Sequence, residues 1–347
     1  MQTLWYILVS IFFVGFAVLD GFDIGVGAIY LLVTKNEAER QQVRKAIGPI
    51  WGGNEVWLIA GAGTLFFAFP DAYAAIFSRF YLGLFVILWA LILRGLSLEL
   101  RTQLDNSLWH AFWDFIFNLA NFGLAGLWGL VLGNFIRGIA VNTVGEPTLP
   151  FWTSFMPDMA PGLIDWYTLV IGGVGFYLLA IHGANFLAWK TSGDLHRRAA
   201  GFASKGVWGI IPALGLAVVL TGKVRPSVID RFIANPWGFV FPVLAIGALI
   251  GGIVMMRKEQ AGKAFLFSSL TLLFLLSTVV FFMFPNFLVD VTGNQNFTAF
   301  NSMTNVRNLR IGLTWFSIGF LLLLGYVVVM YKSFWGKVSE KPQEEGY

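Results

Sequence analysis

The 347-residue sequence contains no cysteine and little charge. Without thiols the chain can form neither a disulfide nor a thiolate metal site, and a cysteine nucleophile is excluded. Charged residues make up 12% of the chain and hydrophobic residues 57%, which is more apolar surface than a soluble domain of this length needs. The H-E-x-x-H, G-x-x-x-x-G-K-S/T and G-x-S-x-G motifs are missing too. Zinc-protease, nucleotide and serine-hydrolase sites therefore have no support.

Histidine is scarce as well, with three in the whole chain: His110, His182 and His196. His196 lies in a basic segment between two apolar stretches and is predicted to be solvated. His110 stands four residues before Asp114, where an i,i+4 pair is the simplest interpretation. His182 lies inside an apolar stretch without a matched partner, which is a weak basis for a haem site. No metal or haem is therefore expected on this chain.

Nine long apolar stretches dominate the sequence. Because a bilayer core of about 30 Å needs about 20 apolar residues in a helix, they predict an all-α polytopic membrane protein with nine transmembrane helices. No composition shift marks a second domain, so residues 1–347 are predicted to form one, and no cleavable signal peptide is expected. The predicted spans are Thr3–Val33, Pro49–Phe69, Ala74–Leu98, Leu108–Ile136, Leu163–Trp189, Val207–Leu220 (the shortest), Gly238–Met256, Ala264–Phe284 and Ile311–Tyr331.

Lysine and arginine are unevenly distributed over the connections between these spans. Most of the 23 Lys and Arg residues lie in the first, third, fifth and seventh connections and in the C-terminal tail. Since basic residues mark the cytoplasmic side, the N-terminus is predicted outside and the C-terminus in the cytoplasm. The net charge of +4 is then a topology signal, and no nucleic-acid partner is expected.

Asp20 and Asp23 lie in the cytoplasmic half of the first span, in the sequence Asp-Gly-Phe-Asp-Ile-Gly-Val-Gly. Their spacing places both carboxylates on one helix face, about 4.5 Å apart along the axis. An ionised carboxylate at this depth is costly, so the pair must share a proton, meet a cation or line a wet cavity. The alternative is a packing role, in which the acids bond neighbouring backbone and Gly21, Gly25 and Gly27 let another helix approach.

The second span places a further acid at a similar depth. Glu55 lies about nine residues from Ala46, which places it about 13 Å deep, and Asp23 lies about ten residues from Val33, about 15 Å deep on the antiparallel first span. These acids are therefore predicted to form a wet cluster that is open to the cytoplasm. Asn54, beside Glu55, is predicted to hydrogen-bond across the helix pair.

These motifs resemble subunit II of the cytochrome bd quinol oxidases. The similarity lies in the segments Asp20–Gly27, Ile47–Ile59 and Phe69–Ala74, and it extends over the whole chain, including the number and orientation of the spans. The motif and packing residues are Gly21, Gly25, Gly27, Trp51, Gly53, Asn54, Trp57, Arg94, Glu99, Arg101 and Asp114.

The resemblance implies a complex in a prokaryotic cell (inner) membrane that oxidises membrane quinol and reduces dioxygen. Subunit I would carry haem b, haem d and the quinol-oxidation site, and this chain would carry no haem. The implied fold is two four-helix bundles plus one peripheral helix. In this family subunit II stabilises subunit I and offers it a cytoplasmic proton route, and some members hold a structural quinone here. Whether a small single-helix accessory subunit attaches is left open.

The sequence departs from the family pattern at Gly52. The family usually reads Trp-Asp-Gly/Ala-Asn here, and that aspartate is its best proton-route residue. Three alternatives stay open: Glu55, one turn further on the same face, substitutes for it; the route is displaced; or water fills it. The proton-route candidates are thus Asp20, Asp23 and Glu55. A proton- or ion-coupled transporter and a purely structural scaffold are the alternative functions.

Overall fold

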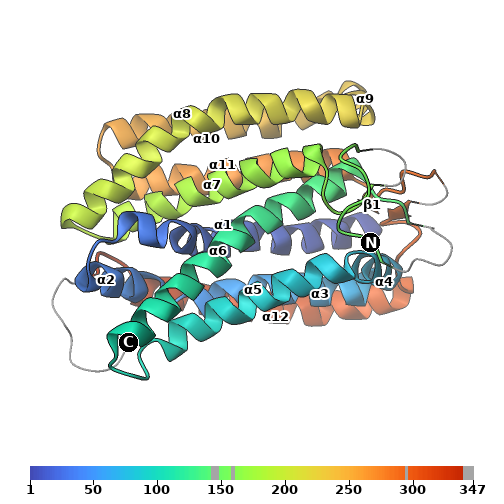
Figure 1. Cartoon of the computed structure of the whole chain (residues 1–347). Coiled ribbons are helices and arrows are strands. Elements are labelled where there is room, and N and C mark those ends of the chain that lie inside the picture. Colours follow the sequence, from blue (N-terminus) through green and yellow to red (C-terminus); the bar gives the residue numbers. More distant parts are fainter. Residues whose placement is uncertain (142–147, 158–160, 294–295, 339–347) are drawn as a thin grey trace.

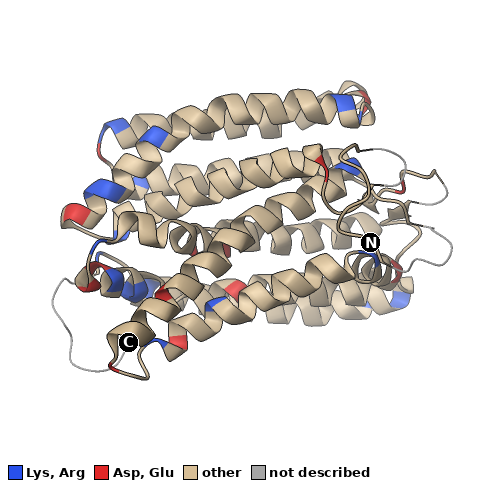
Figure 2. Ribbon diagram, in the orientation of Figure 1, with Lys and Arg blue, Asp and Glu red and all other residues tan. Residues whose placement is uncertain are grey.

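A computed structural model describes residues 1–347 except 142–147, 158–160, 294–295 and 339–347. Within this part, long helices run side by side, and charged residues gather towards their two ends (Figures 1 and 2). Eight of the described helices are long and apolar enough to cross a membrane, which confirms an all-α polytopic membrane protein. They are α1 (Gln2–Val33), α5 (Tyr81–Leu100), α6 (Ser107–Arg137), α7 (Trp166–Lys190), α8 (Gly193–Val224), α10 (Val240–Arg257, after the 3-10 turn Pro236–Phe239), α11 (Ala261–Met283) and α12 (Val306–Ser333).

A ninth helix, α3, corresponds to the predicted span Pro49–Phe69. It runs over Trp51–Ala68, carries Asn54 and Glu55 in its first two turns, and is not among the eight described helices that are long and apolar enough to cross a membrane. Three shorter helices lie between the long ones. They are α2 (Glu37–Ile47), α4 (Pro70–Arg79) and α9 (Ser227–Ala234).

Two predicted spans have different extents in the structure. The span Val207–Leu220, predicted to be the shortest, is part of α8, which is 32 residues long. The first turns of α8 are amphipathic, with Leu195 and Ala203 buried among polar neighbours, so an apolar-run search misses them. The span Ala74–Leu98 is divided between α4 and α5, which are separated at Phe80.

The loops after α6 and α11 pack together at the end of the molecule that holds the N-terminus (Figure 1). Strands β1 (Asn286–Leu288) and β2 (Phe297–Thr298) pair there as an antiparallel ribbon. Ile139 donates its amide proton to the carbonyl of Val289 at 2.9 Å and accepts one from Val291 at 3.0 Å. At this end, backbone hydrogen bonds therefore join two loops that are far apart in the sequence.

Helix α1 lies at the centre and packs against α3, α6 and α7. Its glycines permit this close packing. A Cβ atom on Gly25 would lie 1.8 Å from the carbonyl oxygen of Leu179, and one on Gly183 of α7 would lie 2.2 Å from the amide nitrogen of Val26. A Cβ on Gly27 would meet the side chain of Asn121 at 2.2 Å. Larger residues would thus push α6 and α7 away from the buried acids of α1.

Candidate functional site

Asp20 of α1 is paired with Arg94 of α5, and both side chains are buried. Nη1 and Nη2 of Arg94 donate to the two carboxylate oxygens at 2.7 and 2.5 Å. The ring of Trp51 lies 5.9 Å from the guanidinium carbon. A bidentate, charge-assisted pair of this kind neutralises both ions at a depth where neither is stable alone. Sequence analysis marked Arg94 as a motif residue and missed its pairing, although an arginine inside an apolar span is itself a signal.

Asp23, one turn further along α1, has a different environment. Its Oδ2 accepts a hydrogen bond from Nδ2 of Asn54 at 2.7 Å. Its Oδ1 is buried and has no hydrogen-bond partner within the described part of the chain. Asn54 in turn accepts a hydrogen bond on Oδ1 from the hydroxyl of Tyr331 at 2.8 Å. The predicted bond from Asn54 across the helix pair is confirmed, while Tyr331 was not anticipated.

Glu55 lies at the edge of this group. It is half-buried and within electrostatic range of Arg94 and Asp20. Gly52, one turn earlier, faces open space, since a Cβ atom there would meet no atom within 4 Å. Ile59 on the same side of α3 is 68% exposed. Sequence reasoning thus located the three acids in one region, but Glu55 sits beside a face of α3 that the described chain leaves uncovered.

A further buried carboxylate, Asp114 of α6, lies nearer the α2 end of the molecule. It accepts hydrogen bonds from Tyr30 at 2.7 Å, from Nε and Nη2 of Arg101 at 2.6 and 2.9 Å, and from Arg40 at 3.0 Å. These donors come from α1, the end of α5 and α2. The predicted i,i+4 partner, His110, is not among them, because the arginines bring charge-assisted donors to the same oxygens.

Arg101 also fixes α2. Its Nη2 donates to Oε2 of Glu37 at 2.7 Å. Burial acts to raise the pKa of Glu37, but the hydrogen bond and charge of Arg101, with the charge of Arg44, outweigh it and lower that pKa. Glu99, in the last turn of α5, is exposed. The cluster around Asp114 therefore ties α1, α2, α5 and α6 together.

His182 of α7 is fully engaged by this chain. Its Nδ1 lies 2.7 Å from the hydroxyl of Ser268, and its Nε2 lies 3.0 Å from the carbonyl oxygen of Val18. Its ring stacks on Phe265, with ring centres 5.1 Å apart. With both nitrogens bonded, the side chain does not fit the role of an axial haem ligand.

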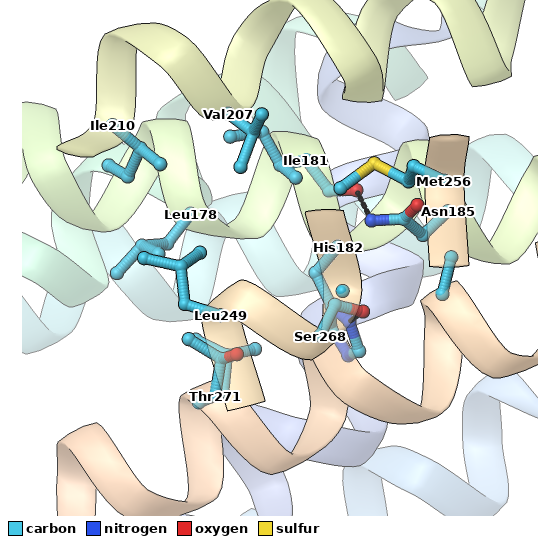
Figure 3. A pocket seen from close by; sticks show the side chains of 13 residues that line it. Leu178, Ile181, His182, Asn185, Val207, Ile210, Leu249, Met256, Ser268 and Thr271 are labelled. Carbon is cyan, nitrogen blue, oxygen red and sulfur yellow. Dashed lines mark hydrogen bonds between the residues drawn. The ribbon is translucent and has the colours of Figure 1, made fainter. Parts of the chain in front are cut away.

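A small cavity of about 30 Å³ lies beside His182, between α7, α8, α10 and α11. Figure 3 shows His182 and Ser268 close together among its lining residues, which also include Leu249. This volume holds about two water molecules. His196, predicted to be solvated in a loop, instead lies within α8 and bonds the carbonyl oxygen of Ala188 at 2.6 Å.

Comparisons with known proteins agree with this architecture. The family model of cytochrome bd terminal oxidase subunit II matches residues 1–334. The probable cytochrome oxidase subunit 2 of Haemophilus influenzae is 30% identical over 98% of this chain and 95% of its own length. Cytochrome bd-I ubiquinol oxidase subunit 2 of Escherichia coli is 28% identical over 99% and 97%.

A solved structure shares the fold. A chain of the bd oxidase from Geobacillus thermodenitrificans has a TM-score of 0.74 and 15% identity, covering 96% of this chain and 98% of that one. At this identity the likeness concerns the fold alone, whereas the family match covers nearly the whole sequence. The chain therefore belongs to the cytochrome bd terminal oxidase subunit II family and is a multi-pass inner-membrane subunit of a quinol oxidase complex.

Proposed function

We propose that this chain is a haem-free subunit that stabilises a haem-bearing subunit I and supplies it with protons from the cytoplasm. The observation that carries the proton route is the state of Asp23: a fully buried carboxyl whose Oδ1 has no hydrogen-bond partner within the described residues. Such an oxygen is costly to bury unless it binds a proton or water. Oxygen reduction to water consumes protons, so a buried proton carrier has a use in this complex.

The three acids have different roles in this proposal. Asp20 and Arg94 neutralise each other and provide a fixed, polar frame. Asp23 carries the proton, because none of the described residues donates a hydrogen bond to its Oδ1. Glu55 extends the route to the uncovered face of α3, where the family's usual aspartate is replaced by Gly52.

The proposed topology has nine spans, with α3 counted beside the eight helices given above. In it the N-terminus is outside, and α2 and the first turns of α8 lie at the cytoplasmic side. We infer that residues 1–347 act as one transmembrane unit, arranged as two four-helix bundles and a peripheral helix. The basic residues of α2 and of the start of α8 support this orientation.

Haem b, haem d, quinol and dioxygen are assigned to subunit I in this proposal. The bonded nitrogens of His182 support a haem-free chain. His182→Ala should therefore leave every haem absorption band of the assembled complex in place. Loss of one band from an assembled complex would overturn the assignment.

This chain should stabilise subunit I and should in turn depend on subunit I for its own stability. The outer side chains of α12 and α3 are strongly exposed, with Leu322 at 71% and Ile59 at 68%. Expressed without subunit I, the chain should be degraded or aggregate. Recovery of a monodisperse, protease-resistant single subunit in good yield would contradict this part of the proposal.

The proton route is tested by quinol-driven oxygen consumption over a pH series. Asp23→Asn removes the titratable group but keeps the shape, and turnover should fall at least about tenfold with haem bands and assembly intact. Asp194→Asn, at an exposed acid of α8, is the matched control and should have no effect. Full turnover in Asp23→Asn at every pH would leave the chain a structural scaffold. Membership in an oxidase subunit family argues against the transporter, for which no described feature was found, whereas a purely structural scaffold agrees in part with the proposed stabilising role.

A further inference from the structure

The side chain of Asn54 connects α12 to the proposed proton carrier. Its Nδ2 donates to Oδ2 of Asp23 at 2.7 Å, and its Oδ1 accepts from the hydroxyl of Tyr331 at 2.8 Å. Asn54 and Asp23 are both 0% exposed. Three side chains from α1, α3 and α12 thus form one short hydrogen-bonded series, and Tyr331 is its outermost member.

An asparagine amide can face a carboxyl in two ways. It can present its NH₂ group, which donates, or its carbonyl oxygen, which accepts. A protonated Asp23 is compatible with either, because a carboxylic acid both donates and accepts. In the structure the hydroxyl of Tyr331 donates to Oδ1 of Asn54, and in this arrangement the NH₂ group is directed at Asp23.

We propose that Tyr331 is a positioning residue that acts on Asp23 through Asn54. With the NH₂ group of Asn54 held against Oδ2, that oxygen is occupied as an acceptor, and Oδ1 becomes the atom that gains and loses the proton. The bonding geometry stands by itself, and its use in proton transfer rests on the proposed function. A fixed protonation site matters because proton transfer requires the donor and acceptor atoms to be in hydrogen-bond reach.

The placement of Tyr331 depends on a close approach of α12 to α3. At Gly53 a Cβ atom would lie 2.5 Å from the sulfur of Met330 and 2.9 Å from the hydroxyl oxygen of Tyr326. The glycine therefore lets the cytoplasmic end of α12 lie directly against α3. Met330 is buried there, whereas most of α12 is exposed.

The test is infrared difference spectroscopy of the whole complex, recorded between two pH values. Carboxyl-labelled ¹³C-aspartate identifies aspartate bands, and the band that Asp23→Asn removes is that of Asp23. Tyr331→Phe should shift this band, because the NH₂ group of Asn54, which donates to Oδ2 of Asp23, is then no longer held in place by the tyrosine hydroxyl. Turnover should fall about two- to tenfold, the range that one hydrogen bond supports. Tyr326→Phe removes a hydroxyl from the same helix at a residue that is 52% exposed, and should change neither.

The Asn54→Leu variant distinguishes an effect of Tyr331 on Asp23 that acts through Asn54 from a direct effect of Tyr331. In Asn54→Leu the Asp23 band should already be shifted, and adding Tyr331→Phe should shift it no further. An unshifted band in Tyr331→Phe, or an equal extra shift in the Asn54→Leu background, would overturn the proposal. If Asp23→Asn keeps full turnover while Tyr331→Phe shifts the band, the positioning stands and the proton route is wrong.

Discussion

Two buried aspartates, Asp23 and Asp114, contrast sharply in this molecule. Asp114 accepts four hydrogen bonds from Tyr30, Arg101 and Arg40, so that both oxygens are satisfied by donors from three other elements. Asp23 accepts one hydrogen bond, on one oxygen, among the described residues. Both lie in apolar helices that border α2 or α3.

The difference indicates two uses for a buried carboxyl. A carboxylate whose lone pairs are all taken by cationic and hydroxyl donors is a structural tie, because loss of its charge would leave those donors unpaired. A carboxyl with a free oxygen has capacity for a proton. The adjacent Asp20 shows that this freedom is local, since one helical turn away the same face is bound at both oxygens by Arg94.

The largest effect is expected from breaking the Asp20–Arg94 pair. Arg94→Gln leaves Asp20 as an uncompensated buried charge, which costs about 3–5 kcal/mol. The assembled complex should be recovered in low yield or unfold at a much lower temperature, as measured by thermal unfolding of the purified complex. Such a loss of stability would show that the Asp20–Arg94 pair has a structural role, like Asp114 and unlike Asp23.

The double variant Asp20→Asn/Arg94→Gln is the control for that result. It removes both charges and keeps two groups that can hydrogen-bond, so it should recover much of the lost stability. A double variant no more stable than Arg94→Gln would show that the loss has a cause other than the unpaired carboxylate.

The second prediction compares the stability and the turnover of variants at Asp114 and Asp23. Asp114→Asn should lower the free energy of unfolding by about 1.5–3 kcal/mol, because charge-assisted hydrogen bonds are lost, and leave turnover per assembled complex within about twofold. Asp23→Asn should do the opposite, changing stability by less than about 1 kcal/mol while turnover falls. Thermal unfolding and oxygen consumption of the same preparations decide this. Similar profiles for the two variants would remove the distinction.

Much of the architecture could be predicted from apolar runs, because a helix in lipid must present apolar side chains over its whole length. The predicted spans Thr3–Val33 and Ile311–Tyr331 lie within α1 and α12. The first turns of α8 were missed for the converse reason: they lie among polar residues, where burial follows one face of the helix. Helix α3 is not counted among the eight apolar helices because it carries the polar site residues Asn54 and Glu55.

The site was predicted as far as local spacing reaches. Asp20 and Asp23 share one helix face, and Asn54 bonds across the helix pair as expected. Tyr331 lies 277 residues from Asn54 in sequence, and no periodicity tells which helix packs beside α3. The partners of Arg94 and Asp114 also lie on other helices, so spacing along the sequence could not predict them. Tertiary packing therefore determines which carboxyl has an oxygen without a hydrogen-bond donor among the described residues.

The third prediction concerns the carboxylate absent at Gly52. Glu55→Gln keeps size and hydrogen bonding but cannot titrate, so turnover should fall about two- to tenfold if Glu55 extends the route from Asp23. Adding Gly52→Asp restores an acid where a side chain has room, and should recover part of the loss. Gly52→Asn in the same background is the control and should recover nothing. Equal turnover in all four proteins would confine the route to α1.

The smallest effect should come from Glu37 in the cluster of Asp114. Its lowered pKa means that its contribution to stability is present above the unfolded value of about 4.3 and is lost as the pH falls through the lower folded value. Because its side chain is 47% exposed, solvent screens the ion pair, and Glu37→Gln should cost at most about 1 kcal/mol near neutral pH. In thermal unfolding, the gap between the two proteins should narrow as the pH approaches about 4 and when salt is added. A gap independent of both would mean that Glu37 holds α2 by packing and not by charge.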